Sequence, residues 1–132
     1  MSKKTFRAGV LHGDEVTELF RYANENKFAI PAVNCTSSST VNAVLETAKA
    51  LNSPVIIHFI NGVAAFFDCK GLSNDVHKSA IAVGLSAALH VHPMALAYCV
   101  TVILHHSNCA KTLLPWIHRL LDLRQTVSPH HS

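Results

Sequence analysis

The chain has 132 residues, of which 49% are hydrophobic and 14% are charged, so it can bury a core and does not read as a disordered protein. Eleven Lys and Arg against eight Asp and Glu give a formal net charge of +3. These charges are not clustered, so we expect no nucleic-acid partner. Four separated cysteines and an N-terminus without an apolar signal segment predict free thiols in the cytoplasm.

The first predicted helix begins with Asp14 as its N-cap and runs to Lys27. Glu15 and Glu18 lie in its first turn, where the helix dipole favours carboxylates. We interpret these acids as helix-start residues rather than as a catalytic carboxylate pair. The apolar run over 28–33 then predicts a first buried strand.

Helices and apolar strands continue to alternate along the chain. A Ser-Thr cluster over 36–40 caps the second helix, and Asn52-Ser53-Pro54 ends it. After this helix we predict a strand over 55–59, a polar loop to Asp75, a helix over 76–97, a strand over 100–104 and a helix over 112–123.

The run from Ser79 to Leu104 contains no Asp, Glu, Lys or Arg, and it is long enough to raise a membrane-associated segment over 79–104 as one alternative. His90, His92 and Pro93 interrupt the run, and its last residues are β-branched. We therefore interpret it as a buried helix followed by a buried strand, and we expect no membrane partner.

Continuous apolar strands separated by helices are typical of parallel βαβ units, so we predict an α/β fold with right-handed crossovers. Chemistry in such folds gathers at the carboxyl ends of the strands. Those ends are Asn34-Cys35, Asn61-Gly62 and the segment from His105 to Cys109.

The last of these segments reads His105-His106-Ser107-Asn108-Cys109-Ala110-Lys111. It resembles the His-x-Asp-His-Cys-Ala-Lys signature of class II, zinc-dependent fructose-bisphosphate aldolases. Other stretches resemble the fungal and bacterial members in order and in register: Ala29 to Asn34, Thr36 to Val44, Asn61-Gly62, Lys70-Gly71 and Leu113 to Trp116. The resemblance extends from residue 9 to residue 121.

The resemblance implies a TIM (β/α)8 barrel, which takes about 250 residues, so we expect this chain to form only an incomplete N-terminal part of one. We expect residues 1–122 to be the partial barrel. Residues 123–132 resemble nothing in the family, and we predict an unrelated, disordered tail there, as a truncated or frame-shifted reading frame would give. An ancestry among tagatose-bisphosphate aldolases stays open.

The family cleaves fructose 1,6-bisphosphate to dihydroxyacetone phosphate and glyceraldehyde 3-phosphate in glycolysis. Its zinc ion polarises the carbonyl group, and its signature Asp moves the proton of the aldol hydroxyl. Ser107 replaces that Asp, and Asn108 replaces a zinc-binding His. We therefore predict no catalytic residue, no metal ligand and no stoichiometric zinc in this chain, which we expect to be inactive.

Asn34 is the one residue to which the resemblance assigns a substrate contact, with a cap of its own turn as the alternative. Ile60 and Val63 replace a Ser and a Gly of the family, and both changes remove contacts to a sugar phosphate. Lys111 is equally a solvated charge at a helix start or a ligand contact. We interpret Trp116 as a packing residue.

The ten histidines offer no obvious chelating pair. His105 and His106 are adjacent and so lie on opposite faces of a strand. His90 and His92 diverge by about 200° on a helix. We expect ordinary hydrogen bonds for these side chains.

A different class of function is a non-catalytic interaction or oligomerisation module. We expect a three-stranded sheet with two open edges and an uncovered apolar face. Such a chain would associate with itself or with an intact homologue.

Overall fold

The computed structural model describes residues 5–59, 78–106 and 111–127. The described elements, in chain order, are β1 (Gly9–Val10), α1 (Asp14–Glu25), β2 (Ala32–Asn34), α2 (Ser38–Leu51), β3 (Val55–His58), α4 (Lys78–Ala97), β4 (Thr101–His105), the 3₁₀ turn η2 (Lys111–Leu113) and α5 (Leu114–Val127).

The strands form one parallel sheet in the order β1-β4-β3-β2. The α/β fold with parallel βαβ units is therefore confirmed. The described sheet has four strands rather than the predicted three, because the two-residue strand β1 pairs with Thr101 and Val102 of β4. A strand of two residues is too short to give an alternating pattern in the sequence.

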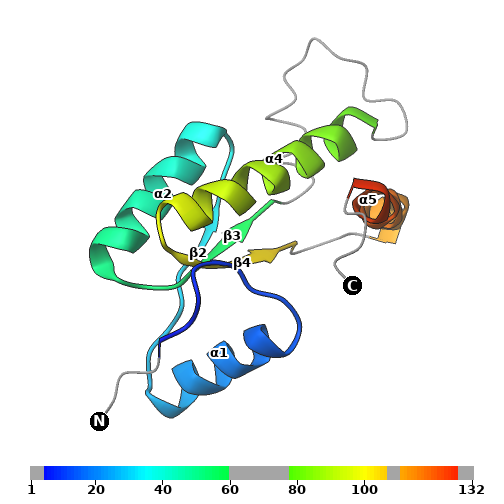
Figure 1. Cartoon of the computed structure of the whole chain (residues 1–132). Coiled ribbons are helices and arrows are strands. Elements are labelled where there is room, and N and C mark those ends of the chain that lie inside the picture. The colour runs from blue at the N-terminus through cyan, green and yellow to red at the C-terminus, as the bar shows by residue number, and fades with distance from the viewer. Residues whose placement is uncertain (1–4, 60–77, 107–110, 128–132) are drawn as a thin grey trace.

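Helices α2 and α4 pack on the same face of the sheet, and α1 packs on the other (Figure 1). The first face buries Leu45 of α2, Val91 of α4 and Ile57 of β3 completely. Crossover helices that share one face are typical of a (β/α)8 barrel, whereas an open doubly wound sheet carries them on both faces.

We had predicted an uncovered apolar face, but helix α1 covers the second face of the sheet. Leu19 of α1 is buried against Leu11 and Ile103, with Val16 and Ile56 packed around them. Helix α1 thus covers apolar surface that the sequence interpretation had assigned to absent strands. Burial of one leucine side chain contributes about 1.5–3 kcal/mol.

Two predicted element starts are wrong. The N-cap of α1 is Gly13 and not Asp14, and no side chain caps this helix. Gly13 has a positive φ of 51°, which glycine adopts without a Cβ clash. The first strand does not begin at Phe28, because its N–H donates to the carbonyl of Ala23 and closes the end of α1.

The start and end of α2 are confirmed. The hydroxyl of Ser37 accepts a hydrogen bond from the N–H of Thr40 at 3.1 Å, which is an N-cap. Asn52 ends the helix in the left-handed conformation with φ 49°. Local side-chain chemistry therefore fixes both ends of this helix.

The run over 79–104 divides into α4 and β4, which confirms a buried helix followed by a strand. Within the described residues, no helix is long and apolar enough to cross a membrane. The last helix, α5, continues to Val127, so residues 123–127 are helical and the prediction of a disordered tail is wrong for them. Residues 128–132 lie outside the described part of the chain.

Candidate functional site

A row of three polar side chains lies at the carboxyl ends of three neighbouring strands. Asn34 of β2 is in register with His58 of β3, which in turn is in register with His105 of β4. His58 and His105 each lie two residues after an isoleucine that packs toward α1, so the row belongs to that face of the sheet. Polar side chains thus meet at the carboxyl edge of the sheet, where sites in parallel α/β folds lie.

A cavity of about 540 Å³ lies beside this row. Its polar lining comes from His12, His58 and His105, and its walls include Val16 and Phe20 of α1. His12 follows β1, so all three imidazoles come from the carboxyl ends of strands. Sequence reasoning missed this cavity because it did not predict β1 or the packing of α1.

His58 and His105 contact each other directly. The Nε2 of His58 is 3.1 Å from the Nδ1 of His105, and the ring centroids are 4.7 Å apart. One of the two nitrogens must carry the proton of this hydrogen bond. Burial and the neighbouring charges of His105 and His106 lower the pKa of His58 below its ordinary value. The sequence feature that could have indicated this contact is that each histidine is the last residue of an apolar strand.

His106 faces the opposite way from His105, as predicted. Its Nδ1 contacts the carbonyl oxygen of Phe59, and its ring lies edge-on to Trp116 with the centroids 5.4 Å apart. Burial of the ring is the main cause of a lowered pKa for His106, and the contact with the Phe59 carbonyl opposes that shift.

Trp116 is a packing residue, as predicted. It is 2% exposed and packs with Ile81 of α4 and Ile117. Within the described part of the chain, its indole N–H has no hydrogen-bond acceptor. The contact joins α5 to α4.

The structure places Asn34 in an exposed position at the end of β2. Both roles of Asn34, a substrate contact and a cap of its own turn, stay predictions. The next residue, Cys35, is fully buried, and burial raises the pKa of its thiol to about 11. Cys35 and Cys99 are both free thiols.

Other residues singled out from the sequence lie outside the described residues, namely Ile60, Asn61-Gly62, Val63, Ser107, Asn108 and Cys109. Lys111 begins η2 and is exposed. Among the described residues, no group of three or more His, Cys, Asp or Glu side chains is arranged to hold a metal ion.

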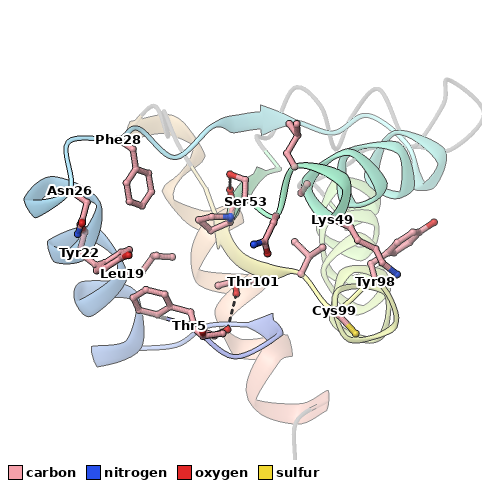
Figure 2. A pocket seen from close by; sticks show the side chains of 16 residues that line it. Thr5, Leu19, Tyr22, Asn26, Phe28, Lys49, Ser53, Tyr98, Cys99 and Thr101 are labelled. Atoms are coloured by element: carbon pink, nitrogen blue, oxygen red, sulfur yellow. Dashed lines mark hydrogen bonds between the residues drawn. The ribbon is translucent and has the colours of Figure 1, made fainter. Parts of the chain in front are cut away.

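A second cavity, of about 570 Å³, lies at the opposite, amino end of the strands (Figure 2). Asn26 donates to the carbonyl of Tyr22, and the hydroxyl of Thr101 donates to the carbonyl of Arg7. The hydroxyl of Ser53 likewise donates to a backbone carbonyl. We place the candidate site at the carboxyl edge, because sites in parallel α/β folds lie at the carboxyl ends of the strands.

Comparison with known proteins agrees with this arrangement. The family model described as "Fructose-bisphosphate aldolase class-II" matches residues 14–122. The class 2 fructose-bisphosphate aldolase of Escherichia coli (strain K12) is 52% identical over 117 residues, which are 88% of this chain and 33% of that protein. The aldolase of Aspergillus oryzae is 48% identical over 92% of this chain and 34% of its own length.

A solved structure extends the likeness to the fold. The crystal structure of fructose-bisphosphate aldolase from Campylobacter jejuni superposes with a TM-score of 0.86 at 45% identity, over 95% of this chain and 35% of that one. The chain thus spans about a third of the length of its relatives, and its sheet is part of a barrel, as predicted. By sequence and by fold, this chain belongs to the class II fructose-bisphosphate aldolase family.

Proposed function

We propose that this chain derives from a sugar-phosphate aldolase, does not itself cleave fructose 1,6-bisphosphate, and retains Asn34 as a substrate contact. The observation that supports this proposal is the set of side chains at the carboxyl edge. The cavity there is lined by the imidazoles of His12, His58 and His105, and the signature positions of the base and of a zinc ligand hold Ser107 and Asn108.

Aldol cleavage needs a base for the proton of the aldol hydroxyl and, in this zinc-dependent family, a metal ion that polarises the carbonyl group. The position of the base holds Ser107, whose hydroxyl titrates far too high for that role. The position of a zinc ligand holds Asn108, and an amide oxygen is a poor ligand for zinc. The donor set does not fit the zinc ion of the family, so we propose that zinc is not bound stoichiometrically.

Asn34 is suited to a binding role. Its amide can both donate and accept hydrogen bonds, and it lies exposed at the strand end beside His58. We propose that it contacts a hydroxyl group of a sugar phosphate.

The test of catalysis is turnover of fructose 1,6-bisphosphate by the 132-residue chain, with added zinc and with a chelator, beside an assay of zinc content. The class 2 aldolase of Escherichia coli serves as the positive control. We expect no chelator-sensitive turnover and no stoichiometric zinc. Zinc-dependent cleavage by this chain would overturn the proposal.

The test of binding is a titration with fructose 1,6-bisphosphate, followed by the amide resonances at the carboxyl edge. We expect shifts near Asn34 that the Asn34→Ala variant loses. Asn26→Ala is the matched control, because Asn26 lies at the amino end of the sheet. Equal shifts in both variants would contradict a contact between Asn34 and the sugar phosphate.

A second candidate function, association with another copy or with an intact homologue, is supported by the edge strand β2. Pro31 and Cys35 use their backbone groups to pair with β3. The backbone groups of successive strand residues point to alternate sides, so the N–H and C=O of Ala32 point away from β3. Ala32 is also exposed. An unpaired strand edge is a template for another strand.

Light scattering of the purified chain at micromolar concentration tests this association. We expect an oligomer, and Ala32→Lys should shift it toward monomer because charge on an edge strand opposes pairing. Thr47→Lys, on the exposed side of α2, adds the same charge elsewhere and should not. A monomeric unmodified chain would contradict the association.

For location we propose the cytoplasm, which suits the free thiols of Cys35 and Cys99.

A further inference from the structure

We propose that His58 and His105 together form a binding site for one divalent transition-metal ion, with Cu(II) as the ion they hold best. Its two ligands are not the zinc-binding His of the family signature, whose position Asn108 holds, and they come from two different strands. The proposal does not depend on aldolase activity or on binding of a sugar phosphate.

The distance between the two nitrogens fits a shared metal ion. The Nε2 of His58 and the Nδ1 of His105 are 3.1 Å apart. A metal ion about 2.05 Å from each nitrogen would make an N–metal–N angle of about 98°, between the tetrahedral and the square-planar values. Both nitrogens must present a lone pair to the ion, so the imidazole that now donates would carry its proton on its other ring nitrogen instead.

The backbone holds both ligands in place before the metal arrives. His58 and His105 are directly paired residues of β3 and β4, the two central strands of the sheet. Neighbouring parallel strands keep a fixed separation of about 4.8 Å, so little conformational entropy remains to be lost on chelation. Two imidazoles at a fixed separation bind far more tightly than either one alone.

The surroundings leave room for further ligands. The pair lines the cavity of about 540 Å³, and His105 is exposed, so an ion can enter from solvent. Asn34 is the next residue in the row. Because the described residues hold no group of three or more metal-ligating side chains, we expect water to complete the coordination.

The choice of ion follows from the ligand type. Imidazole nitrogen suits copper, nickel and zinc, and affinity for a given nitrogen site rises to Cu(II) and falls again at zinc. A site with two nitrogen ligands and water oxygens also suits the tetragonal geometry of Cu(II). We therefore expect Cu(II) to bind with higher affinity than zinc, and zinc to bind too weakly for the purified chain to retain it stoichiometrically.

The experiment is a titration of the full chain with Cu(II), followed by calorimetry and by electron paramagnetic resonance. A background variant with His130→Gln and His131→Gln removes the adjacent histidine pair at the C-terminus, which can bind copper by itself. In that background we expect one equivalent of Cu(II) with two nitrogen ligands. Either His58→Gln or His105→Gln should weaken it by roughly tenfold or more, and the double variant should lose little further.

His118→Gln is the matched control, because it removes one exposed histidine of α5 away from the site. It should leave the affinity unchanged. An equal loss of affinity in this control, or an unchanged affinity in His58→Gln and His105→Gln, would overturn the proposal and leave an ordinary hydrogen bond between two histidines.

A second measurement needs no substitution and so covers the case in which a variant does not fold. Imidazole resonances of the unmodified chain are recorded while substoichiometric Cu(II) is added. We expect selective broadening of His58 and His105 beyond any broadening of His130 and His131. Broadening that spares His58 and His105 would contradict the site.

Discussion

The Nε2 of His90 lies 3.0 Å from the Oδ1 of Asn42 and joins α4 to α2 on the face of the sheet that both helices cover. Both side chains are partly buried. Because the amide oxygen of Asn42 only accepts, the Nε2 of His90 carries the proton. The contact is an ordinary hydrogen bond, as we predicted for the histidines of this helix.

This hydrogen bond should stabilise the packing of α4 on α2. We expect Asn42→Ala and His90→Ala each to lower the free energy of unfolding by about 1 kcal/mol, and the double variant to lose less than the sum of the two. Urea denaturation of the four proteins measures the coupling. Strictly additive losses would mean that the two side chains do not interact.

The core between α2 and the sheet depends on Leu45, which is fully buried. Leu45→Ala should lower the free energy of unfolding by about 2–5 kcal/mol, because it removes buried apolar surface and leaves a cavity. Leu51→Ala is the control in the same helix, since Leu51 is 71% exposed and should change stability little. The check is the difference between their urea midpoints, and similar midpoints would contradict the packing.

The N-terminus of α2 should depend on the hydroxyl of Ser37. Ser37→Ala removes the acceptor for the N–H of Thr40, and we expect a loss of about 0.5–2 kcal/mol. Ser86→Ala is the control, because the Ser86 hydroxyl only bonds back to the carbonyl of Ala82 within α4. Thermal unfolding should separate the two variants, and equal melting temperatures would argue against the cap.

The ion pair between Arg7 and Glu15 should make stability depend on pH in acid. The guanidinium of Arg7, with help from the N–H of His12, lowers the pKa of Glu15 to about 2. A carboxylate with a lowered pKa stabilises the fold above its unfolded pKa of about 4.3, and that contribution is lost as the pH falls toward about 2.

The comparison is between the unmodified chain and Glu15→Gln, in melting temperature from pH 7 to pH 2. We expect the unmodified chain to be more stable at pH 7 and the difference to shrink through the acid range. A constant difference across that range would show that the charge of Glu15 does not contribute.

Restoring the signature should not by itself restore catalysis. We predict that Ser107→Asp combined with Asn108→His leaves the 132-residue chain inactive toward fructose 1,6-bisphosphate. The other zinc ligands of the family come from later strands, and this chain spans about a third of the length of its relatives. Coupled-enzyme assay of the double variant with added zinc measures this, and zinc-dependent turnover would contradict it.

The family and the order of helices and strands could be predicted from the sequence, because both depend on short stretches of chain. The signature around Cys109-Ala110-Lys111 identified the aldolase family, and the residue types near Ser37 and Asn52 predicted both ends of α2. Apolar runs separated by helical periodicity predicted the parallel sheet. Each of these signals lies within a few neighbouring residues, where local sterics and hydrogen bonding act.

The tertiary structure alone decided how distant residues meet. It placed α1 over the second face of the sheet, added β1 to its edge, and brought His58 within 3.1 Å of His105, 47 residues away in sequence. The pairing of parallel strands depends on how each crossover helix packs back onto the sheet. That packing is a property of the whole buried core. Local sequence therefore determined the helices and strands of this aldolase relative, whereas their packing determined which residues meet at its candidate sites.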